Sequence, residues 1–135
     1  QENDTTFIVS DYEGYLDGVK NIHEVLQESI DIEYDNVING RISLEDYIVI
    51  TEVTSSQVTT QISEFVTSKP SEQWQESYIN YMNGMKKFNE YILETKVLAN
   101  ELKNGVTDVS QTLDRIESIK AESMEYIKKS NELRP

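Results

Sequence analysis

The fold is decided by residues 74–102, which read WQESYINYMNGMKKFNEYILETKVLANEL. Within this stretch an apolar, aromatic or small residue recurs at alternating steps of four and three. These positions are Trp74, Tyr78, Tyr81, Met85, Phe88, Ile92, Thr95, Ala99 and Leu102. Such steps place side chains on one face of a helix, and a sustained period of 3.5 residues is typical of coiled-coil-like packing. The stretch therefore predicts a long helix with one buried face.

Three other segments repeat this period between breaks in the chain. The breaks are Pro70 and the Asn-Gly pairs at 39–40 and 104–105. The four predicted helices span about 5–38, 43–68, 71–103 and 107–133. Their expected core positions are Ile8, Tyr12, Tyr15, Val19, Ile22, Leu26 and Ser29 in the first, Leu44, Ile48, Thr51, Ser55, Val58, Ile62 and Phe65 in the second, and Val109, Leu113, Ile116, Lys120, Ser123 and Ile127 in the fourth.

Residues at the predicted helix ends favour these boundaries. Ser43 followed by Asp46 resembles a capping box, in which a hydroxyl accepts a hydrogen bond from a backbone N–H three residues on. Thr107-Asp108 supplies a cap for the last helix. Gly40 and Gly105 stand where a helix end in the left-handed conformation favours glycine.

Two stretches leave an alternative open. Tyr47–Thr51 is rich in β-branched residues and could form a strand. Asn83-Gly84 falls in the middle of the third predicted helix and could bend it, since glycine costs about 1 kcal/mol against alanine there. We favour a helix in both places because the heptad period continues through them.

Four helices with short connections favour one arrangement. Consecutive elements joined by short links pack next to each other and run antiparallel. The sequence therefore predicts an all-α protein, an up-down-up-down antiparallel four-helix bundle made of two helical hairpins. At 135 residues the chain is expected to form a single domain over 1–135.

The composition excludes several functions. The chain has 12 Lys and Arg against 25 Asp and Glu, a net charge of −13, so its field repels nucleic acids. The absence of cysteine removes disulfides, thiolate metal sites and cysteine nucleophiles. No glycine-rich phosphate loop and no Gly-x-Ser-x-Gly motif is present. We therefore expect no catalytic residue, no cofactor and no enzyme activity.

The only histidine does not complete a metal motif. His23-Glu24 begins the His-Glu-x-x-His motif of zinc proteases, but Gln27 stands at the second histidine position. The Glu-x-x-His motif of di-iron bundles fails because Lys20 precedes His23 by three residues. The acidic run at 31–35 is interpreted as a solvated helix end rather than a cation site. We expect no metal site.

The aromatic residues provide one candidate ligand site. In an up-down bundle the starts of helices one and three lie at the same end as the finish of helix four. The residues expected to gather there are Tyr12, Tyr15, Trp74, Tyr78, Tyr81 and Tyr126. Tyrosine and tryptophan combine an apolar body with a polar tip, which suits a ligand site with aromatic walls. The alternative, which we favour, is that these side chains fill a narrow core.

Polar residues at predicted core positions are a second feature. A buried lysine needs a counter-charge, so Lys120 indicates either a polar pocket or a side chain that turns outward while Ile119 takes its place. We favour the outward orientation. His23 follows Ile22 in the sequence and is expected to be a partly exposed helix residue rather than a ligand or a pH switch.

The second hairpin resembles the helical-bundle domains of prokaryotic extracytoplasmic proteins, especially small lipoproteins and membrane-tethered sensors. The residues that carry the resemblance are Trp74, Tyr78, Tyr81 and Phe88 on one long helix, followed by the link at 105–108. The resemblance implies a location outside the cytoplasm. It identifies no functional residue.

Three functions are compatible with these observations. The chain begins without methionine, which leads us to expect an anchor or signal segment removed from the region before it. We therefore expect a non-enzymatic, membrane-tethered lipoprotein that binds a protein or small molecule or serves as a structural module. The alternative is the ligand-sensing domain of a membrane receptor, and the third is a cytosolic regulator or enzyme. A homodimer is compatible with the heptad faces.

Overall fold

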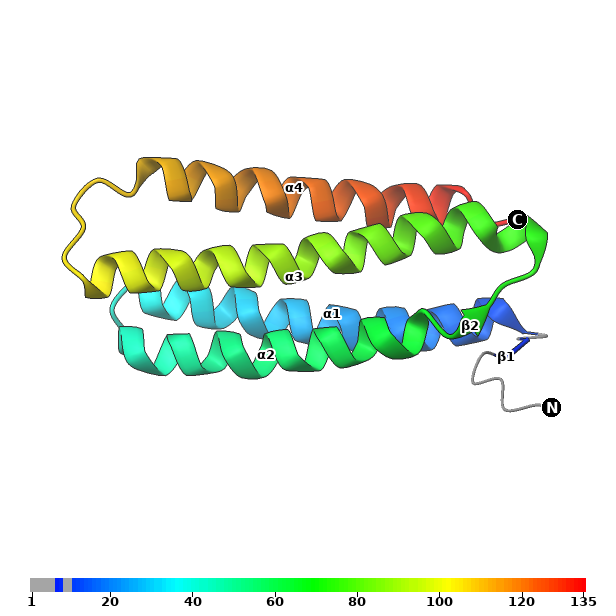
Figure 1. The fold of residues 1–135 in the computed structure, drawn as a ribbon, viewed down its shortest axis with the longest axis horizontal. Helices are drawn as coiled ribbons and strands as arrows, with labels where there is room; N and C mark the ends of the chain where they lie inside the picture. Colours follow the sequence, from blue (N-terminus) through cyan, green and yellow to red (C-terminus); the bar gives the residue numbers. More distant parts are fainter. Residues whose placement is uncertain (1–6, 9–10) are drawn as a thin grey trace.

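The computed structural model describes residues 7–8 and 11–135. Four long helices run antiparallel to their neighbours in an up-down-up-down order, which confirms the predicted all-α four-helix bundle (Figure 1). The helices are α1 (Tyr12–Ile38), α2 (Leu44–Phe65), α3 (Gln75–Lys103) and α4 (Ser110–Glu132). The start of α1 and the end of α4 lie at the same end of the bundle.

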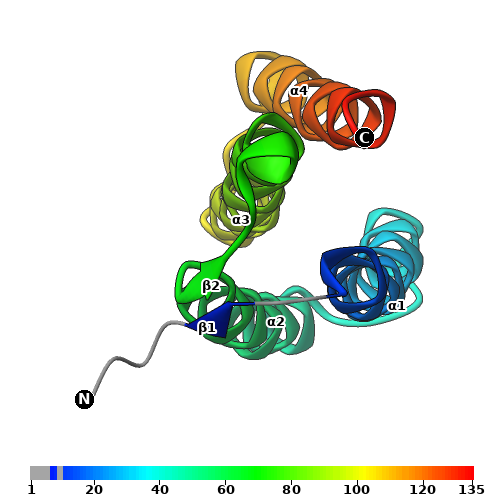
Figure 2. The ribbon, with the colours of Figure 1, turned by 90° about the vertical axis from the view of Figure 1, so that its right-hand side faces the viewer.

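The bundle is open on one side. Each helix packs against the next in sequence, and the contact between α3 and α4 is the most extensive, followed by that between α2 and α3. The end-on view shows α1 and α4 standing apart, each on its own neighbour (Figure 2). The described helices therefore surround a core on three sides and leave a gap between the first and last helix.

The predicted first helix is wrong at its start. Phe7–Ile8 forms the short strand β1, which pairs in parallel with β2 (Ser68–Lys69), and α1 begins at Tyr12. The side chain of Asp11 caps α1 by accepting from the backbone N–H of Gly14 at 3.1 Å. The expected core position Ile8 therefore lies on a strand and not on the helix, while residues 5–6 and 9–10 fall outside the described residues.

The predicted end of the second helix, at about residue 68, is wrong, because α2 ends at Phe65 and Ser68–Lys69 pairs with β1 as a strand. The other helix ends agree more closely with the sequence. Ser43 Oγ accepts from the backbone N–H of Asp46 at 3.0 Å, as the capping box predicts. Gly40 and Gly105 have positive φ angles of 72° and 81°, the conformation that favours glycine at a helix end. At the last helix Asp108 accepts from the backbone N–H and the hydroxyl of Ser110.

The strand alternative for the second helix is wrong, because α2 is helical throughout Leu44–Phe65. Two of its hydroxyls form hydrogen bonds, one within the helix and one to α3. Thr51 donates to the carbonyl of Ile48 at 2.6 Å, and Ser55 donates to the side-chain amide oxygen of Asn89 at 2.7 Å. Hydroxyl groups that find such partners remove the main cost of placing Ser and Thr in a helix.

Small residues bring α3 and α4 into close contact. Ser77 and Ser130 each donate a hydroxyl to the other's backbone carbonyl, at 2.8 Å and 2.7 Å. One heptad further along, Ser123 donates to the carbonyl of Gly84 at 3.0 Å. A Cβ atom on Gly84 would lie 2.6 Å from Cδ1 of Ile127, so a larger residue there would have to displace the Ile127 side chain. The helix continues without a break through Gly84, as we favoured from the sequence.

Two clusters of buried side chains form the core. The first lies around the α1–α2 link and consists of Ile30, Tyr47, Val58, Phe88, Tyr91, Ile92, Leu98, Ala99 and Ile116. The second lies at the end that holds the termini and consists of Tyr12, Leu16, Phe65, Trp74, Tyr81, Met82 and Met85. Trp74 belongs to a short 3-10 turn, η1 (Glu72–Trp74), that leads into α3.

The buried face of α1 differs from the predicted one. Ile22 is 56% exposed and Ser29 is exposed, whereas Leu16, His23 and Ile30 are buried. Leu16, His23 and Ile30 follow one another at steps of seven residues, which places them on one face of the helix together with Tyr12. The buried face of α1 therefore passes through position 23 and not through position 22. The prediction that His23 is partly exposed is therefore wrong, and this correction moves the only histidine into the interior.

No helix in the described part of the chain combines the length and the apolar character that crossing a membrane requires.

Candidate functional site

Five of the six predicted aromatic site residues do meet at one end of the bundle. The ring centroid of Tyr12 lies 5.5 Å from those of both Tyr15 and Trp74. Phe65 stacks on Tyr78 at 4.9 Å and lies 5.7 Å from Tyr81. The geometry therefore groups residues from α1, η1 and α3 around the end of α2.

These aromatic rings belong to the second core cluster or pack against it. Tyr12 and Trp74 are buried, and the Tyr12 hydroxyl lies 3.3 Å from the Ser68 hydroxyl. Burial raises the pKa of Tyr12 above its usual value, so the phenol stays neutral. Tyr126 is placed elsewhere, in a shallow hollow that it forms with other residues of α4. Of the predicted set, Tyr81 alone lines the pocket described next.

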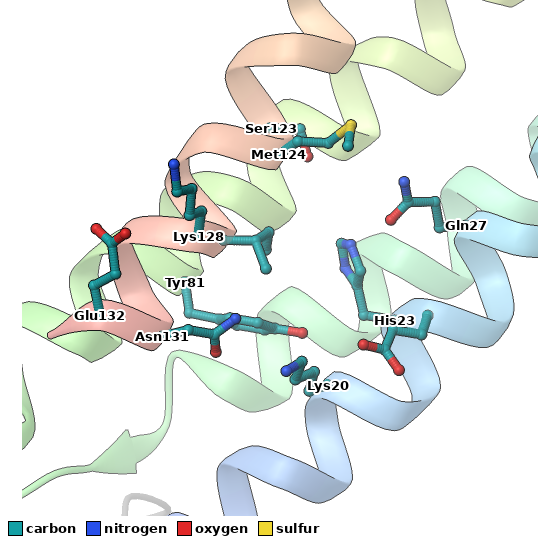
Figure 3. A pocket seen from close by; sticks show the side chains of 11 residues that line it. Lys20, His23, Gln27, Tyr81, Ser123, Met124, Lys128, Asn131 and Glu132 are labelled. Atoms are coloured by element: carbon teal, nitrogen blue, oxygen red, sulfur yellow. The ribbon is translucent and has the colours of Figure 1, made fainter. Parts of the chain in front are cut away.

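A pocket of about 440 Å³ opens between α1 and α4, with α3 as its floor (Figure 3). This volume lies within the range of about 300–1,000 Å³ that small-molecule sites occupy. The lining residues are Lys20, His23, Glu24 and Gln27 of α1, Tyr81 of α3, and Ser123, Met124, Ile127, Lys128, Asn131 and Glu132 of α4. The open side of the bundle thus holds the candidate site.

His23 is the first of two buried polar side chains in this pocket. It is 2% exposed, and its ring lies 4.7 Å from that of Phe88 and 5.9 Å from that of Tyr81. Neither ring nitrogen makes a hydrogen bond of good geometry within the described part of the chain, although the side chain of Gln27 lies close enough to act on the ring. Burial lowers the pKa of His23 to about 4, and the nearby Gln27 side chain opposes this shift only in part. The imidazole is therefore neutral at pH 7.

Tyr81 is the second buried polar side chain in this pocket. It is 1% exposed, and its hydroxyl has no hydrogen-bond partner among residues 7–8 and 11–135. Burial raises its pKa above the ordinary value, with a further contribution from the carboxylate of Glu24. In Figure 3 the ring extends across the pocket, with its hydroxyl toward Lys20 and His23. Two neutral polar groups therefore face the same space from α1 and α3.

Charged side chains surround this polar floor. Lys20 and Glu24 stand on α1, while Lys128 and Glu132 stand on α4. The two positive and two negative charges balance, in a chain whose net charge is −13. The pocket is therefore less negative than the protein around it.

An ion pair crosses the open side beyond the pocket. Lys120 of α4 lies 3.3 Å from the Asp31 carboxylate of α1 and 5.5 Å from the ring centroid of Tyr91. Tyr91 donates its hydroxyl to the same carboxylate at 2.8 Å. Lys120 is half-buried and is paired with the counter-charge of Asp31. Its neighbour Ile119 packs partly against the core, as expected.

A second link joins the helices at the opposite end. Arg134, just beyond α4, lies 2.8 Å from the Asp17 carboxylate and 3.9 Å from that of Glu13, both on α1. The Arg134 guanidinium also lies 6.0 Å from the Trp74 ring centroid. The pocket therefore lies between two polar contacts that hold α1 near α4.

The groups that line the pocket offer hydrogen bonds, apolar contact and charge to a ligand. Within the described ranges no three carboxylate or imidazole side chains are grouped so that they could hold a metal ion. A histidine whose pKa lies near 4 is a weak base at neutral pH. What the pocket offers is hydrogen bonding from two buried groups, apolar contact from Met124 and Ile127, and charge at its rim.

A scan against protein-family models, a search of curated proteins and a search of solved structures each found no match for this chain. The fold and pocket define its class as a four-helix bundle with a ligand-sized pocket between its first and last helices.

Proposed function

We propose that this protein is a binding module that takes a small organic molecule into the pocket between α1 and α4. One observation carries the proposal. His23 and Tyr81 are almost completely buried and line an open pocket, yet their polar atoms make no hydrogen bond of good geometry in the described residues. A ligand with an apolar body and a polar group would supply both hydrogen bonds and cover the apolar wall.

The energetic cost of these two side chains supports the proposal. A buried polar group without a hydrogen bond costs about 1–3 kcal/mol, and such groups are few in native proteins. A phenylalanine at either position would make the same ring contacts without that cost. Side chains that lower stability in this way are typical of functional sites.

An NMR fragment screen tests the proposal. We expect fragments to shift the backbone amide signals of residues 20–27 on α1 and 123–132 on α4. The His23→Phe variant should lose these shifts, whereas Tyr126→Phe, which changes a tyrosine outside the pocket, should keep them. The proposal fails when no fragment binds, or when fragments bind only at the rings around Phe65.

A receptor sensor domain is the second candidate, because the pocket joins the first helix to the last. The start of α1 and the end of α4 lie at the same end of the bundle, so a ligand that draws α1 toward α4 would change the spacing there. Spin labels on cysteines introduced at the exposed positions Glu28 and Glu125 would measure this distance in a chain that has no other cysteine. A sensor is expected to shorten the distance when ligand is added.

The location outside the cytoplasm and the anchoring to a membrane belong to the same proposal. They are supported by the resemblance of the second hairpin to extracytoplasmic bundles. Fractionation of the native cells, with mass spectrometry of the mature N-terminus, tests them. A lipid-modified cysteine before this segment supports anchoring, and a formyl-methionine start in the soluble fraction contradicts it. Light scattering separates the monomer from a homodimer.

A further inference from the structure

Hydrogen-bond donors outnumber acceptors in the deep part of the pocket. Tyr81 offers an O–H, neutral His23 offers one N–H, and the ammonium of Lys20 offers three donors and no acceptor. Lys20 is half-buried, whereas the two carboxylates of the pocket, Glu24 and Glu132, are exposed. In Figure 3 the Lys20 ammonium and the Tyr81 hydroxyl point into the same part of the pocket. The buried groups therefore face the ammonium of Lys20, while the carboxylate of Glu24 also acts on Tyr81.

The lysines of the pocket are free to pair with a ligand. Lys87, Lys96 and Lys120 each form an ion pair with a neighbouring helix. Lys20 and Lys128 have no such partner in the described ranges, although the chain contains 25 acidic residues. They stand on opposite walls, one on α1 and one on α4. Of the two, Lys20 points toward the Tyr81 hydroxyl in Figure 3, and an anion there would gain charge-assisted hydrogen bonds.

The remaining wall is apolar. Ile127 and Met124 line it from α4, and Met124 is 54% exposed although it borders a pocket. Methionine adapts its shape to different apolar partners. A ligand with a hydrocarbon or aromatic body would cover this surface while its polar end reaches the floor.

We propose that the ligand carries a carboxylate on an apolar body, with the carboxylate received by Tyr81 and Lys20 and the body laid against Met124 and Ile127. This inference rests on the proposed binding function and names the ligand class for the same pocket. The N–H of His23 supplies a further donor.

The net charge of the protein makes this inference easy to contradict. A field of −13 attracts cations and repels anions. Binding governed by the whole molecule would therefore favour an amine over an amide and an amide over a carboxylate. The local donors of the pocket predict the reverse order.

Calorimetric titration of the full chain with matched probes tests this order of affinities. The probes are octanoate, octanamide and octylamine, together with 4-phenylbutyrate and its amide and amine. We expect each carboxylate to bind about five- to tenfold more tightly than its amide, the difference between a charge-assisted and a neutral hydrogen bond. The amines should bind most weakly, and a higher salt concentration should not reverse this order.

Three variants locate the effect. Lys20→Gln is expected to bring the affinity for the carboxylate down to that for the amide and to leave the amide affinity within twofold. Tyr81→Phe is expected to weaken both, because the amide carbonyl also accepts from the Tyr81 hydroxyl, and to weaken the carboxylate more. Lys129→Gln removes the same unit of charge from α4 outside the pocket and should change neither affinity. Circular dichroism of each variant checks that the bundle is intact.

The outcomes separate the ligand class from the function. An amide or amine that binds at least as tightly as its carboxylate, at a site that His23→Phe abolishes, overturns the carboxylate and keeps the binding function. An equal loss of carboxylate affinity in Lys129→Gln also overturns the carboxylate site, because general charge then explains the preference. When neither these probes nor the fragment screen shows binding, the proposed function is overturned as well.

Discussion

Replacing His23 by phenylalanine should make the bundle more stable and remove a defined part of its pH dependence. The imidazole has a pKa near 6.5 in the unfolded chain and about 4 in the folded one, because burial disfavours the charged ring. Between these two values the unfolded state binds more protons than the folded state. Stability is therefore present in full above about pH 6.5 and falls as the pH is lowered toward 4.

The size of the effect follows from the two pKa values. Stability falls by about 1.4 kcal/mol per pH unit between them, so lowering the pH from about 7.5 to about 5 removes about 2 kcal/mol. Phenylalanine keeps the ring contacts with Phe88 and Tyr81, and the adjoining pocket has room for its additional atom. At neutral pH the variant should gain about 1–2 kcal/mol, or about 3–8 °C in melting temperature, because no unpartnered ring nitrogen stays buried.

Urea denaturation followed by circular dichroism measures the free energy of unfolding of both proteins at a series of pH values from about 7.5 to about 5. The other titratable groups around the ring are Lys20 and Glu24 of α1, Tyr81 of α3, and Lys128 and Glu132 of α4. They are present in both proteins, so the difference in unfolding free energy between variant and wild type isolates the histidine. That difference should widen by about 2 kcal/mol as the pH falls. A difference in unfolding free energy that stays constant with pH would refute the reasoning, because the pKa of His23 would then be the same in the folded and the unfolded chain.

Three further changes test the packing. Gly84→Val should destabilise the bundle by about 1–3 kcal/mol in urea denaturation, because its side chain meets Ile127 on α4; an unchanged midpoint would show that the helices separate freely. Ser130→Ala should cost about 1–2 kcal/mol because it removes the hydroxyl shared with Ser77, and a double-variant cycle with Ser77→Ala should show that the two losses are not additive. Lys120→Gln should cost less than about 1 kcal/mol and only at low salt, because its ion pair is partly exposed.

The third helix could be predicted almost in full because its pattern is both long and local. Seven of its nine expected core positions in α3 and η1, from Trp74 to Ala99, are buried, whereas Tyr78 is half-buried and Leu102 lies at the exposed end. Heptad spacing over so many turns determines which face is covered, whatever the helix packs against. The caps at Ser43 and Gly40 were predictable for the same reason, since each depends on a few adjacent residues.

The start of the first helix depended on a distant segment. Phe7–Ile8 continues the helical period in sequence, but it pairs with Ser68–Lys69, about sixty residues away. Local periodicity cannot reveal a pairing of this kind, and tertiary contacts override weak helical preference near a chain end. Asp11, which caps the helix that does form, was present in the sequence as a typical N-cap residue.

The pocket is hard to predict from the sequence because hydrophobicity alone places Ile22, and not His23, on the buried face of the first helix. Ile22 was preferred to its neighbour His23 as a core residue, although Leu16 and Ile30 stand seven residues on either side of the histidine. That symmetric spacing was the available signal. A polar residue on an otherwise apolar stripe contradicts the simple pattern, and functional sites are where such contradictions concentrate.

The opening between α1 and α4 follows from how α4 packs on α3. Ser77 and Gly84 are seven residues apart on α3, and they meet Ser130 and Ser123, seven residues apart on α4, in antiparallel register. Small side chains let these two backbones approach closely, so α4 is held on α3 and does not move across to cover α1. The residues of α1 that a closed bundle would bury against α4 instead line a pocket, and His23 is the deepest of them. The same small residues that stabilise the second hairpin therefore leave a pocket on the open side of the bundle.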